Sequence, residues 1–218
     1  MIRLPDNICI YDDVVSQEWC DEVISIFDKK CDAALEKYSG RGDEDIDGVW
    51  IRDSNKRYDM AIGANQYESL KQHCTELKEI LCETLDEYHL EISGLDYKMS
   101  YDVEKLDVKL QRTPPGGGFC KTHYEQGNCK NTSRRFAVWI LYLNDLPEHC
   151  GTDFPNQNAV VTPKAGRLAI WPAAYTHPHG CLRGVTEMKY IATGWFLYHC
   201  GEYPREREGG GSIPEDRY

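Results

Sequence analysis

A histidine and a carboxylate stand two positions apart in the segment KTHYEQG, directly after the glycine-rich run PPGGGFC. Side chains at positions i and i+2 of an extended segment point to the same face, so His123 and Glu125 would present an imidazole and a carboxylate side by side. The ordinary alternative is a solvated turn that follows a glycine loop. Two imidazoles and one carboxylate, with further positions left open, are the ligands of non-haem Fe(II) sites. The pair therefore predicts a metal site if a second histidine lies further along the chain.

Two candidates for that second histidine occur in the segment WPAAYTHPHGC, namely His177 and His179. The local spacing leaves both open, because they share one face if the segment is extended. Lys189 follows ten residues after His179, at the start of the segment KYIATGWF. An ammonium group held there could pair with a dicarboxylic acid chelated to the metal, through a charge-assisted hydrogen bond.

The elements that must position these residues change in character near residue 97. Before it, helical spacing of apolar residues predicts two helices, over residues 16–38 and 67–90, preceded by a short strand in NICIYDDVVS. Ser16 is a suitable N-cap for the first helix. After it, short β-branched and aromatic segments separated by Gly, Pro and Asn predict antiparallel strands. We therefore expect a mainly β fold with two supporting helices.

The chain is expected to form one integrated domain with three parts. Residues 1–96 are predicted to be an N-terminal strand and helical support region, residues 97–203 the β core, and residues 204–218 a flexible C-terminal tail. The polar, glycine-containing residues 39–59 predict a loop. The acidic run at 43–47 within it stands before the core, where it could close over a substrate.

Composition and charge restrict the partners. The formal net charge of −11 argues against binding to nucleic acid or to an anionic membrane surface. No run reaches the roughly 18 apolar residues of a membrane span, and the N-terminal residues do not resemble a signal peptide, so a cytoplasmic location is expected. The ten cysteines are spread evenly without a CxxC pair, which favours reduced thiols over disulfides or a zinc site.

Several ordered segments resemble one known family. PPGGGFCKTHYE, VWILYLNDLP, GTDFPNQNAVVTPKAGRLAIWP and HPHGCLRGVTEMKYIATGWF are similar to the catalytic domain of the 2-oxoglutarate and Fe(II)-dependent oxygenases, in particular the prolyl 4-hydroxylase-like branch. The resemblance covers roughly residues 97–199, and IYDDVVSQEWCDEVISIF resembles the usual entry strand and first helix. It implies a double-stranded β-helix, or jelly-roll, core behind supporting helices.

The resemblance also implies an activity. It implies a dioxygenase that uses Fe(II), 2-oxoglutarate as cosubstrate and O2, with ascorbate as a candidate reductant. The expected reaction is hydroxylation of an unactivated C–H bond, and the expected substrate, by family analogy, is a proline-containing peptide or protein. The oligomeric state does not follow from it.

By position, the resemblance assigns His123, Glu125 and His179 as iron ligands. His179 is favoured over His177 because only from His179 does Lys189 fall at the family's ten-residue spacing. The commoner carboxylate in the family is Asp, and Glu125 is one methylene longer.

The resemblance assigns further residues around the metal. Lys189 and Tyr142 are expected to bind the distal carboxylate of 2-oxoglutarate, with Thr152 near the cosubstrate and Trp195 at the border of the substrate pocket. Tyr142 and Trp195 also lie in apolar strands, where core packing is the ordinary role of aromatic residues. Thr113 stands where many relatives carry a tyrosine that lines the pocket.

Two other functions fit the same residues. In the first, a cupin-like metal enzyme that does not use 2-oxoglutarate would bind its metal with His123, Glu125, His177 and His179. In the second, a non-catalytic jelly roll would recognise peptides in the same groove. Consumption of 2-oxoglutarate distinguishes both from an oxygenase.

Overall fold

The framework of the protein is a large antiparallel sheet. The structure, a computed structural model, describes residues 1–54, 57–94, 106–119, 121–182 and 185–199. The large sheet consists of β1 (Ile2–Leu4), β2 (Ile8–Tyr11), β3 (Glu44–Ile46), β4 (Val49–Ser54), β5 (Arg57–Gly63), β6 (Lys109–Thr113), β7 (Arg135–Tyr142), β10 (Arg167–Pro172) and β12 (Lys189–Leu197). Its strand order is β1-β2-β10-β7-β12-β6-β5-β4-β3, and every adjacent pair is antiparallel.

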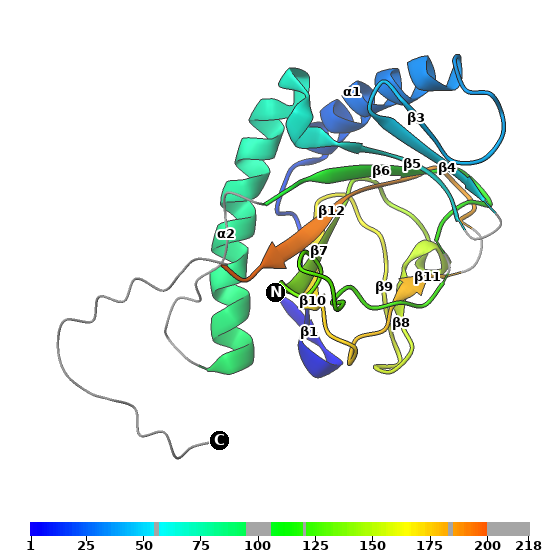
Figure 1. Ribbon diagram of the computed structural model, residues 1–218. Coiled ribbons are helices and arrows are strands. Elements are labelled where there is room, and N and C mark those ends of the chain that lie inside the picture. The colour runs from blue at the N-terminus through cyan, green and yellow to red at the C-terminus, as the bar shows by residue number, and fades with distance from the viewer. Residues whose placement is uncertain (55–56, 95–105, 120, 183–184, 200–218) are drawn as a thin grey trace.

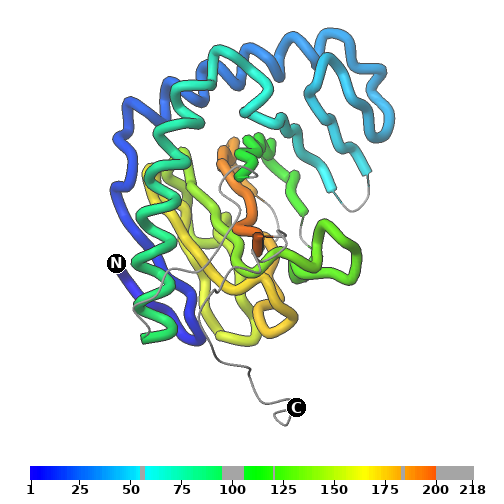
Figure 2. Tube along the Cα trace, turned by 60° about the vertical axis from the view of Figure 1, so that its left-hand side comes forward, coloured from blue at the N-terminus to red at the C-terminus, as the bar shows by residue number. Residues whose placement is uncertain are grey.

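A small sheet lies on one side of the large sheet and two helices on the other (Figure 1). The small sheet has the order β11-β8-β9, with β8 (Thr152–Phe154), β9 (Ala159–Val161) and β11 (Gly180–Cys181). The helices are α1 (Gln17–Leu35) and α2 (Lys71–Ser93). Figure 2 shows both helices following the outside of the sheet. The expectation of a mainly β fold with two supporting helices is confirmed.

The ends of the helices follow local signals in the sequence. The Ser16 hydroxyl accepts a hydrogen bond from the backbone N–H of Trp19 at 3.2 Å, as expected for an N-cap. Helix α2 ends at Gly94, whose φ of 65° is the left-handed conformation that closes many helices. It begins at Lys71, later than the sequence predicts, because residues 64–66 and 68–70 form short 3-10 turns.

Strand β7 shows why the core has two layers. Alternate side chains of a strand point to opposite faces. Trp139 and Leu141 pack in the cluster that includes the helices, whereas Val138 and Tyr142 pack in the cluster between the two sheets. All four are almost completely buried, so β7 is covered on both faces. This explains the apolar run FAVWILYL.

The loop predicted at residues 39–59 is wrong over much of its length. Strands β3 and β4 form a hairpin there, and β5 begins at Arg57. The turn between β3 and β4 is Asp47–Gly48, with φ of 51° and 81°, the pair of positive values that a tight hairpin turn requires. The polar residues belong to the edge of the sheet, where charge prevents edge-to-edge pairing. Part of the acidic run at 43–47 is therefore strand β3.

The predicted support region contributes strands as well as helices. Strands β1 to β5 belong to the same sheet as the strands of the predicted core. The expected boundary at residue 97 and the expected tail at 204–218 lie outside the described residues. None of the described helices combines the length and the apolar character that crossing a membrane requires. Among the described cysteines, those at positions 9, 20, 31, 74, 129 and 150 are free thiols.

Candidate active site

Two distant segments meet in a short backbone bridge. The N–H of His123 donates to the carbonyl of His179 at 2.9 Å, and the N–H of His179 donates back to the carbonyl of His123 at 2.8 Å. The N–H of Glu125 donates to the carbonyl of Ala173, just after β10, at 3.1 Å. These bonds hold the segment that follows the glycine loop against the segment that leads into β11.

The glycine loop is itself held against β5. Gly118 and Tyr58 exchange two backbone hydrogen bonds, of 2.9 and 3.3 Å. A Cβ atom added at Gly117 would lie 2.5 Å from the carbonyl oxygen of Tyr58, so only glycine allows this approach. The run PPGGGF therefore brings the backbone before His123 close to the large sheet.

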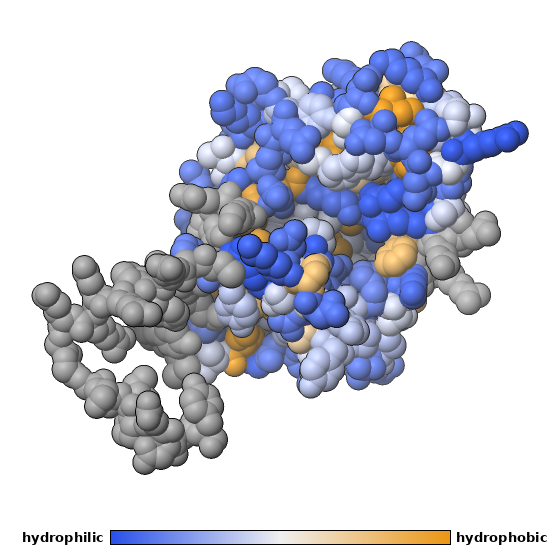
Figure 3. Space-filling view, viewed as in Figure 1, coloured by the Kyte–Doolittle hydropathy of each residue, from blue (hydrophilic) through white to orange (hydrophobic). Residues whose placement is uncertain are grey.

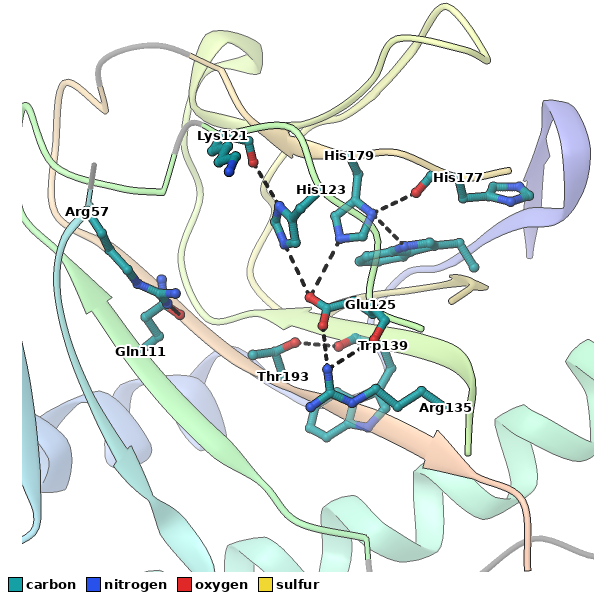
Figure 4. A network of polar contacts seen from close by, with 11 residues as sticks. Arg57, Gln111, Lys121, His123, Glu125, Arg135, Trp139, His177, His179 and Thr193 are labelled. Atoms are coloured by element: carbon teal, nitrogen blue, oxygen red, sulfur yellow. Dashed lines mark hydrogen bonds and ion pairs between the residues drawn. The ribbon is translucent and has the colours of Figure 1, made fainter. Parts of the chain in front are cut away.

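Three side chains converge at the bridge (Figure 4). The potential ligand atoms of His123, Glu125 and His179 all lie within 4.8 Å of one another. The Nε2 atoms of His123 and His179 lie 3.2 and 4.0 Å from the same Glu125 oxygen, Oε1. Tyr124 points away and is 54% exposed. The segment forms an isolated bridge rather than the expected strand, but it presents positions 123 and 125 to one side as the alternation predicts.

Backbone carbonyls set the tautomers of both histidines. Nδ1 of His123 lies 2.8 Å from the carbonyl oxygen of Lys121, and Nδ1 of His179 lies 2.9 Å from that of His177. Because a carbonyl can only accept, each Nδ1 carries the proton and each Nε2 keeps a lone pair. Burial lowers the pKa of His179 to about 4, so this ring stays neutral.

This arrangement fits a bound cation. Two Nε2 lone pairs and a carboxylate oxygen face one another, and they repel unless a positive ion lies among them. Carbonyl acceptors on the far nitrogens are the usual support for metal-bound histidines. The donor set of two imidazoles and one carboxylate is that of non-haem Fe(II) sites. His123, Glu125 and His179 therefore fit ferrous iron.

An arginine that the sequence analysis did not single out holds the carboxylate in place. Nη1 of Arg135 donates to Oε2 of Glu125 at 2.8 Å and to its backbone carbonyl at 3.2 Å. The guanidinium also lies 3.6 Å above the ring of Trp195. Burial alone would raise the pKa of Glu125, but its polar and charged neighbours, among them the Arg135 guanidinium, outweigh burial and lower that pKa.

His177 does not join the cluster. Its Nε2 atom contacts the backbone carbonyl of Asp6, and its Nδ1 atom lies 2.9 Å from the Thr176 hydroxyl. The ring is buried and is directed toward the N-terminal segment. The structure thus brings His179, and not His177, to His123. The four-ligand site of the cupin-like alternative does not form among the described residues.

A cavity of about 310 Å³ opens beside the three ligands. His123, Glu125 and His179 line it together with Lys189, Thr152 and Trp195, all of which the sequence predicts at the site. The further lining residues are Arg57, Lys109, Gln111, Thr113, Gly118, Phe119, Val138, Ile140, Trp171, Gly180, Cys181, Val185, Ile191 and Thr193. The cavity volume is in the range of small-molecule sites.

Lys189 lies at the deep end of this cavity. Its side chain is 6% exposed, and Nζ donates to the carbonyl of Cys150 at 2.6 Å. It stands opposite Thr113 in the pairing of β12 with β6, so the small side chain of Thr113 leaves room beside the ammonium. A buried cation in a cavity is a suitable partner for an organic acid.

Tyr142 lies behind the cavity wall. It is fully buried and is not among the lining residues. Its hydroxyl is 2.7 Å from the Thr152 hydroxyl, and its ring centroid is 5.6 Å from Nζ of Lys189. Burial raises the pKa of Tyr142, so the phenol stays protonated. It can therefore orient the Thr152 hydroxyl, which does line the cavity.

Sequence reasoning missed one wall of the cavity. Lys109, Gln111 and Thr113 alternate along β6 and face inward, and Arg57 joins them from β5. The sequence feature that could have indicated this wall is the polar residue at every second position of KLQRT. A strand that faces solvent shows the same alternation. Only the pairing of β6 with β12 shows that this face points into the cavity.

The comparisons with known proteins agree with this geometry. Residues 108–197 match the family model described as the 2OG-Fe(II) oxygenase superfamily. Among curated protein sequences, none matches the chain. Solved structures with a similar fold include a viral collagen prolyl hydroxylase from Paramecium Bursaria Chlorella virus-1 in its 2OG complex, at 19% identity and a TM-score of 0.57, covering 89% of this chain and 98% of that one.

Two further structures share the fold. A prolyl-4-hydroxylase from Pseudomonas putida has 17% identity and a TM-score of 0.58, covering 89% of this chain and 94% of that one. A prolyl hydroxylase from Trichoplax adhaerens, in complex with a hypoxia inducible factor oxygen degradation domain peptide fragment, has 18% identity and a TM-score of 0.58, covering 88% and 84%. The core is thus the expected double-stranded β-helix. Residues 108–197 thus match the 2OG-Fe(II) oxygenase superfamily, and this match, together with the ligand set and the cavity, supports a 2-oxoglutarate-dependent dioxygenase.

Proposed function

We infer that this dioxygenase hydroxylates a prolyl residue of a peptide or protein. The observation that carries the proposal is the convergence of His123, Glu125 and His179 at a cavity that has the Lys189 ammonium at its deep end. The choice of a peptide is supported by the fold shared with prolyl hydroxylases, one of which was solved with a peptide. The choice of proline rests on the same similarity.

Two imidazoles and one carboxylate would coordinate Fe(II). His123 and His179 supply neutral Nε2 donors, because their Nδ1 protons are bound to backbone carbonyls. Glu125 supplies Oε1, while Arg135 occupies its other oxygen. Bound ferrous iron, 2-oxoglutarate and O2 supply the oxidation that converts a substrate C–H into C–OH and releases succinate and CO2.

The deep end of the cavity binds and orients 2-oxoglutarate. The Lys189 ammonium pairs with its distal carboxylate, and the Thr152 hydroxyl, positioned by Tyr142, donates to the same end. The walls beside these groups are apolar, with Val138, Ile140 and Ile191 facing inward. Apolar walls exclude water from the reaction and strengthen the electrostatic pairing between Lys189 and the distal carboxylate.

We also propose a cytoplasmic location. The thiols of Cys9, Cys20, Cys31, Cys74, Cys129 and Cys150 form no disulfide, which supports a reducing compartment.

The proposal is tested by incubating the Fe(II) protein with 2-oxoglutarate, O2, ascorbate and a panel of proline-containing peptides. The expected result is a mass gain of one oxygen on a peptide, with one succinate released per hydroxylated peptide. Lys189→Ala should abolish both. An exposed lysine away from the cavity, Lys130, serves as the matched control in a Lys130→Ala variant. Peptide binding without succinate release would instead show a non-catalytic module.

A further inference from the structure

A second group of charged residues lies at the opposite end of the cavity from Lys189. Lys109 pairs with Thr193 in the register of β6 and β12, while Lys189 pairs with Thr113. Four strand positions separate the two lysines, or about 13 Å along the sheet. 2-Oxoglutarate is shorter than this distance. The two lysines therefore extend from well-separated backbone positions of the same cavity wall.

The positive charges at this end exceed the negative ones. Asp59 is fully buried, and its two oxygens lie 2.7 Å from Nη2 of Arg52 and 2.6 Å from Nε of Arg57. Gln111 donates to the second of these oxygens at 3.3 Å. The single carboxylate is thus shared by two arginines, and no hydrogen bond or ion pair joins it to Lys109 among the described residues.

The groups around the metal site do not provide negative charge that would balance Lys109 and Arg57. Ferrous iron, Lys189 and Arg135 carry four positive charges, against three from Glu125 and 2-oxoglutarate. Lys109 and Arg57 both line the cavity, so their charges face the space left for substrate. Figure 4 shows Arg57 and Gln111 extending from their strands toward the region where His123 and Glu125 meet. A partly buried ammonium such as that of Lys109, beside an arginine whose carboxylate partner is already shared, is stabilised by an anionic ligand.

The two cations that line this end of the cavity, Arg57 and Lys109, differ in sign from the net charge of the whole protein. The chain carries a formal net charge of −11, and the face shown in Figure 3 is mostly hydrophilic. An acidic substrate is not attracted by the protein as a whole, so Arg57 and Lys109 must act at short range. Such an arrangement selects substrates by local pairing rather than by long-range steering.

The ring of Phe119 contacts both Arg57 and His123 and so limits the distance between Arg57 and the metal site. The Arg57 guanidinium lies 5.0 Å from the ring centroid of Phe119, and that ring lies 4.8 Å from the ring of His123. Arg57 and His123 can be no farther apart than these two distances combined. An extended peptide advances about 3.3–3.6 Å per residue, so a group paired with Arg57 lies within about three residues of the reacting one.

We propose that Lys109 and Arg57 form a subsite for an acidic side chain, Asp or Glu, within about three residues of the hydroxylated position of a peptide substrate. This inference rests on the proposed peptide hydroxylation. A carboxylate matches both cations, because an arginine fork and an ammonium each donate to it. Lys109 is then a specificity-determining residue.

The test uses the holoenzyme with Fe(II), 2-oxoglutarate and O2. The peptides have blocked ends and one proline, with either Glu or Gln placed one, two or three residues to either side. The ratio of kcat/KM for the Glu peptide over its Gln partner should be about 10 or more at the preferred position, as expected for a charged hydrogen bond. In Lys109→Met that ratio should approach 1, while in Lys130→Met it should stay at the wild-type value.

A binding measurement separates failure of this subsite from failure of the proposed reaction. Peptide affinity is measured by calorimetry with Mn(II) and 2-oxoglutarate under anaerobic conditions. Hydroxylation of Glu and Gln peptides at equal efficiency overturns the subsite and leaves the reaction standing. Binding that prefers Glu through Lys109, without hydroxylation, supports the subsite and overturns the reaction. Neither binding nor hydroxylation of any peptide overturns both.

Two additional experiments test the source of the acid and the role of charge. A neutral peptide with a free C-terminal carboxylate distinguishes the source of the acid, since a Lys109-dependent preference for that peptide alone overturns the side-chain assignment. Lys109→Glu assayed with a Lys peptide tests the charge directly, because its preference should reverse toward Lys. Thermal melting of Lys109→Met verifies folding, and its midpoint should not fall below that of the wild type because a buried cation has been removed.

Discussion

Arg135 donates to Oε2 of Glu125 at 2.8 Å and leaves Oε1 to face the two histidines. Glu has one more methylene than Asp and therefore more freedom to place its carboxylate. The arginine restricts that freedom, and Trp195 stacks on the guanidinium from the other side at 3.6 Å. The metal site is thus held by a chain of contacts that runs from β12 through β7 to Glu125.

Replacing Arg135 should weaken metal binding. In Arg135→Leu the carboxylate loses its partner and can rotate away from the histidines, so Mn(II) affinity should fall about 10- to 100-fold. Calorimetry with Mn(II) measures this without turnover. Arg134→Leu is the matched control, since Arg134 donates to the Tyr198 carbonyl rather than to a ligand. Equal Mn(II) affinity in Arg135→Leu and the wild type would show that Glu125 is positioned without Arg135.

The two neighbouring histidines should differ in their effect on metal. His179→Ala removes an Nε2 donor that faces Glu125, so Mn(II) binding should be lost. His177→Ala should keep Mn(II) affinity within about threefold of the wild type, because that ring contacts Asp6 and Thr176 instead. It should lower the melting temperature, because buried polar partners are left unpaired. A comparable loss of Mn(II) in both variants would return His177 to the ligand set.

Lys189 should affect the cosubstrate and not the metal. In Lys189→Ala the buried partner of the distal carboxylate is gone, which costs about 2–5 kcal/mol of 2-oxoglutarate binding. Mn(II) affinity without 2-oxoglutarate should stay close to that of the wild type. Titration of 2-oxoglutarate into the Mn(II) protein measures the first quantity. An unchanged 2-oxoglutarate affinity would remove Lys189 from the cosubstrate site.

Tyr142 should act through Thr152. In Tyr142→Phe the Thr152 hydroxyl loses its partner at 2.7 Å, which should lower the unfolding free energy by about 1–2 kcal/mol. The loss of 2-oxoglutarate affinity should be smaller than in Lys189→Ala, since Tyr142 does not line the cavity. Thr152→Val combined with Tyr142→Phe should be less damaging than the two changes added together. Strict additivity in chemical denaturation would show that the two hydroxyls act independently.

The acidic-peptide preference should depend on pH. Burial, aided by the charges of two arginines, lowers the pKa of Lys109 from 10.5 to about 8. The ammonium is therefore present below pH 8 and is lost as the pH rises through that value, so the Glu-over-Gln ratio should fall there. Between about pH 8 and 10.5 the unfolded chain holds the extra proton, so this group adds stability as the pH rises. The charged groups that influence it are Arg52, Arg57, Asp59 and Glu125.

Lys109→Arg tests the assignment of that pH dependence. An arginine stays charged over the whole range, so the Glu-over-Gln ratio should remain constant from pH 7 to about pH 10. The ratio cancels pH effects on the metal and on 2-oxoglutarate, because both peptides share them. A ratio that still falls near pH 8 in Lys109→Arg would assign the titration to another group.

Local patterns in the sequence predicted much of this protein. Alternation placed His123 and Glu125 on one side of an extended segment, the Ser16 cap marked the start of α1, and the spacing to Lys189 indicated an organic acid. These features depend on neighbouring residues, so they can be read from periodicity and residue type. The hairpin at Asp47–Gly48 had such a signal too, but its polar composition concealed it.

The tertiary structure decided which distant groups meet. The alternation of the extended segment leaves His177 and His179 on one face, and in the structure the carbonyl of Asp6, far away in the chain, holds the ring of His177 out of the site. The positions of Arg135 beside Glu125 and of Lys109 in the cavity depend on the pairing of β7 and β6 with β12. Such pairings are set by packing across the whole sheet, because a register shift of one residue turns every side chain to the opposite face.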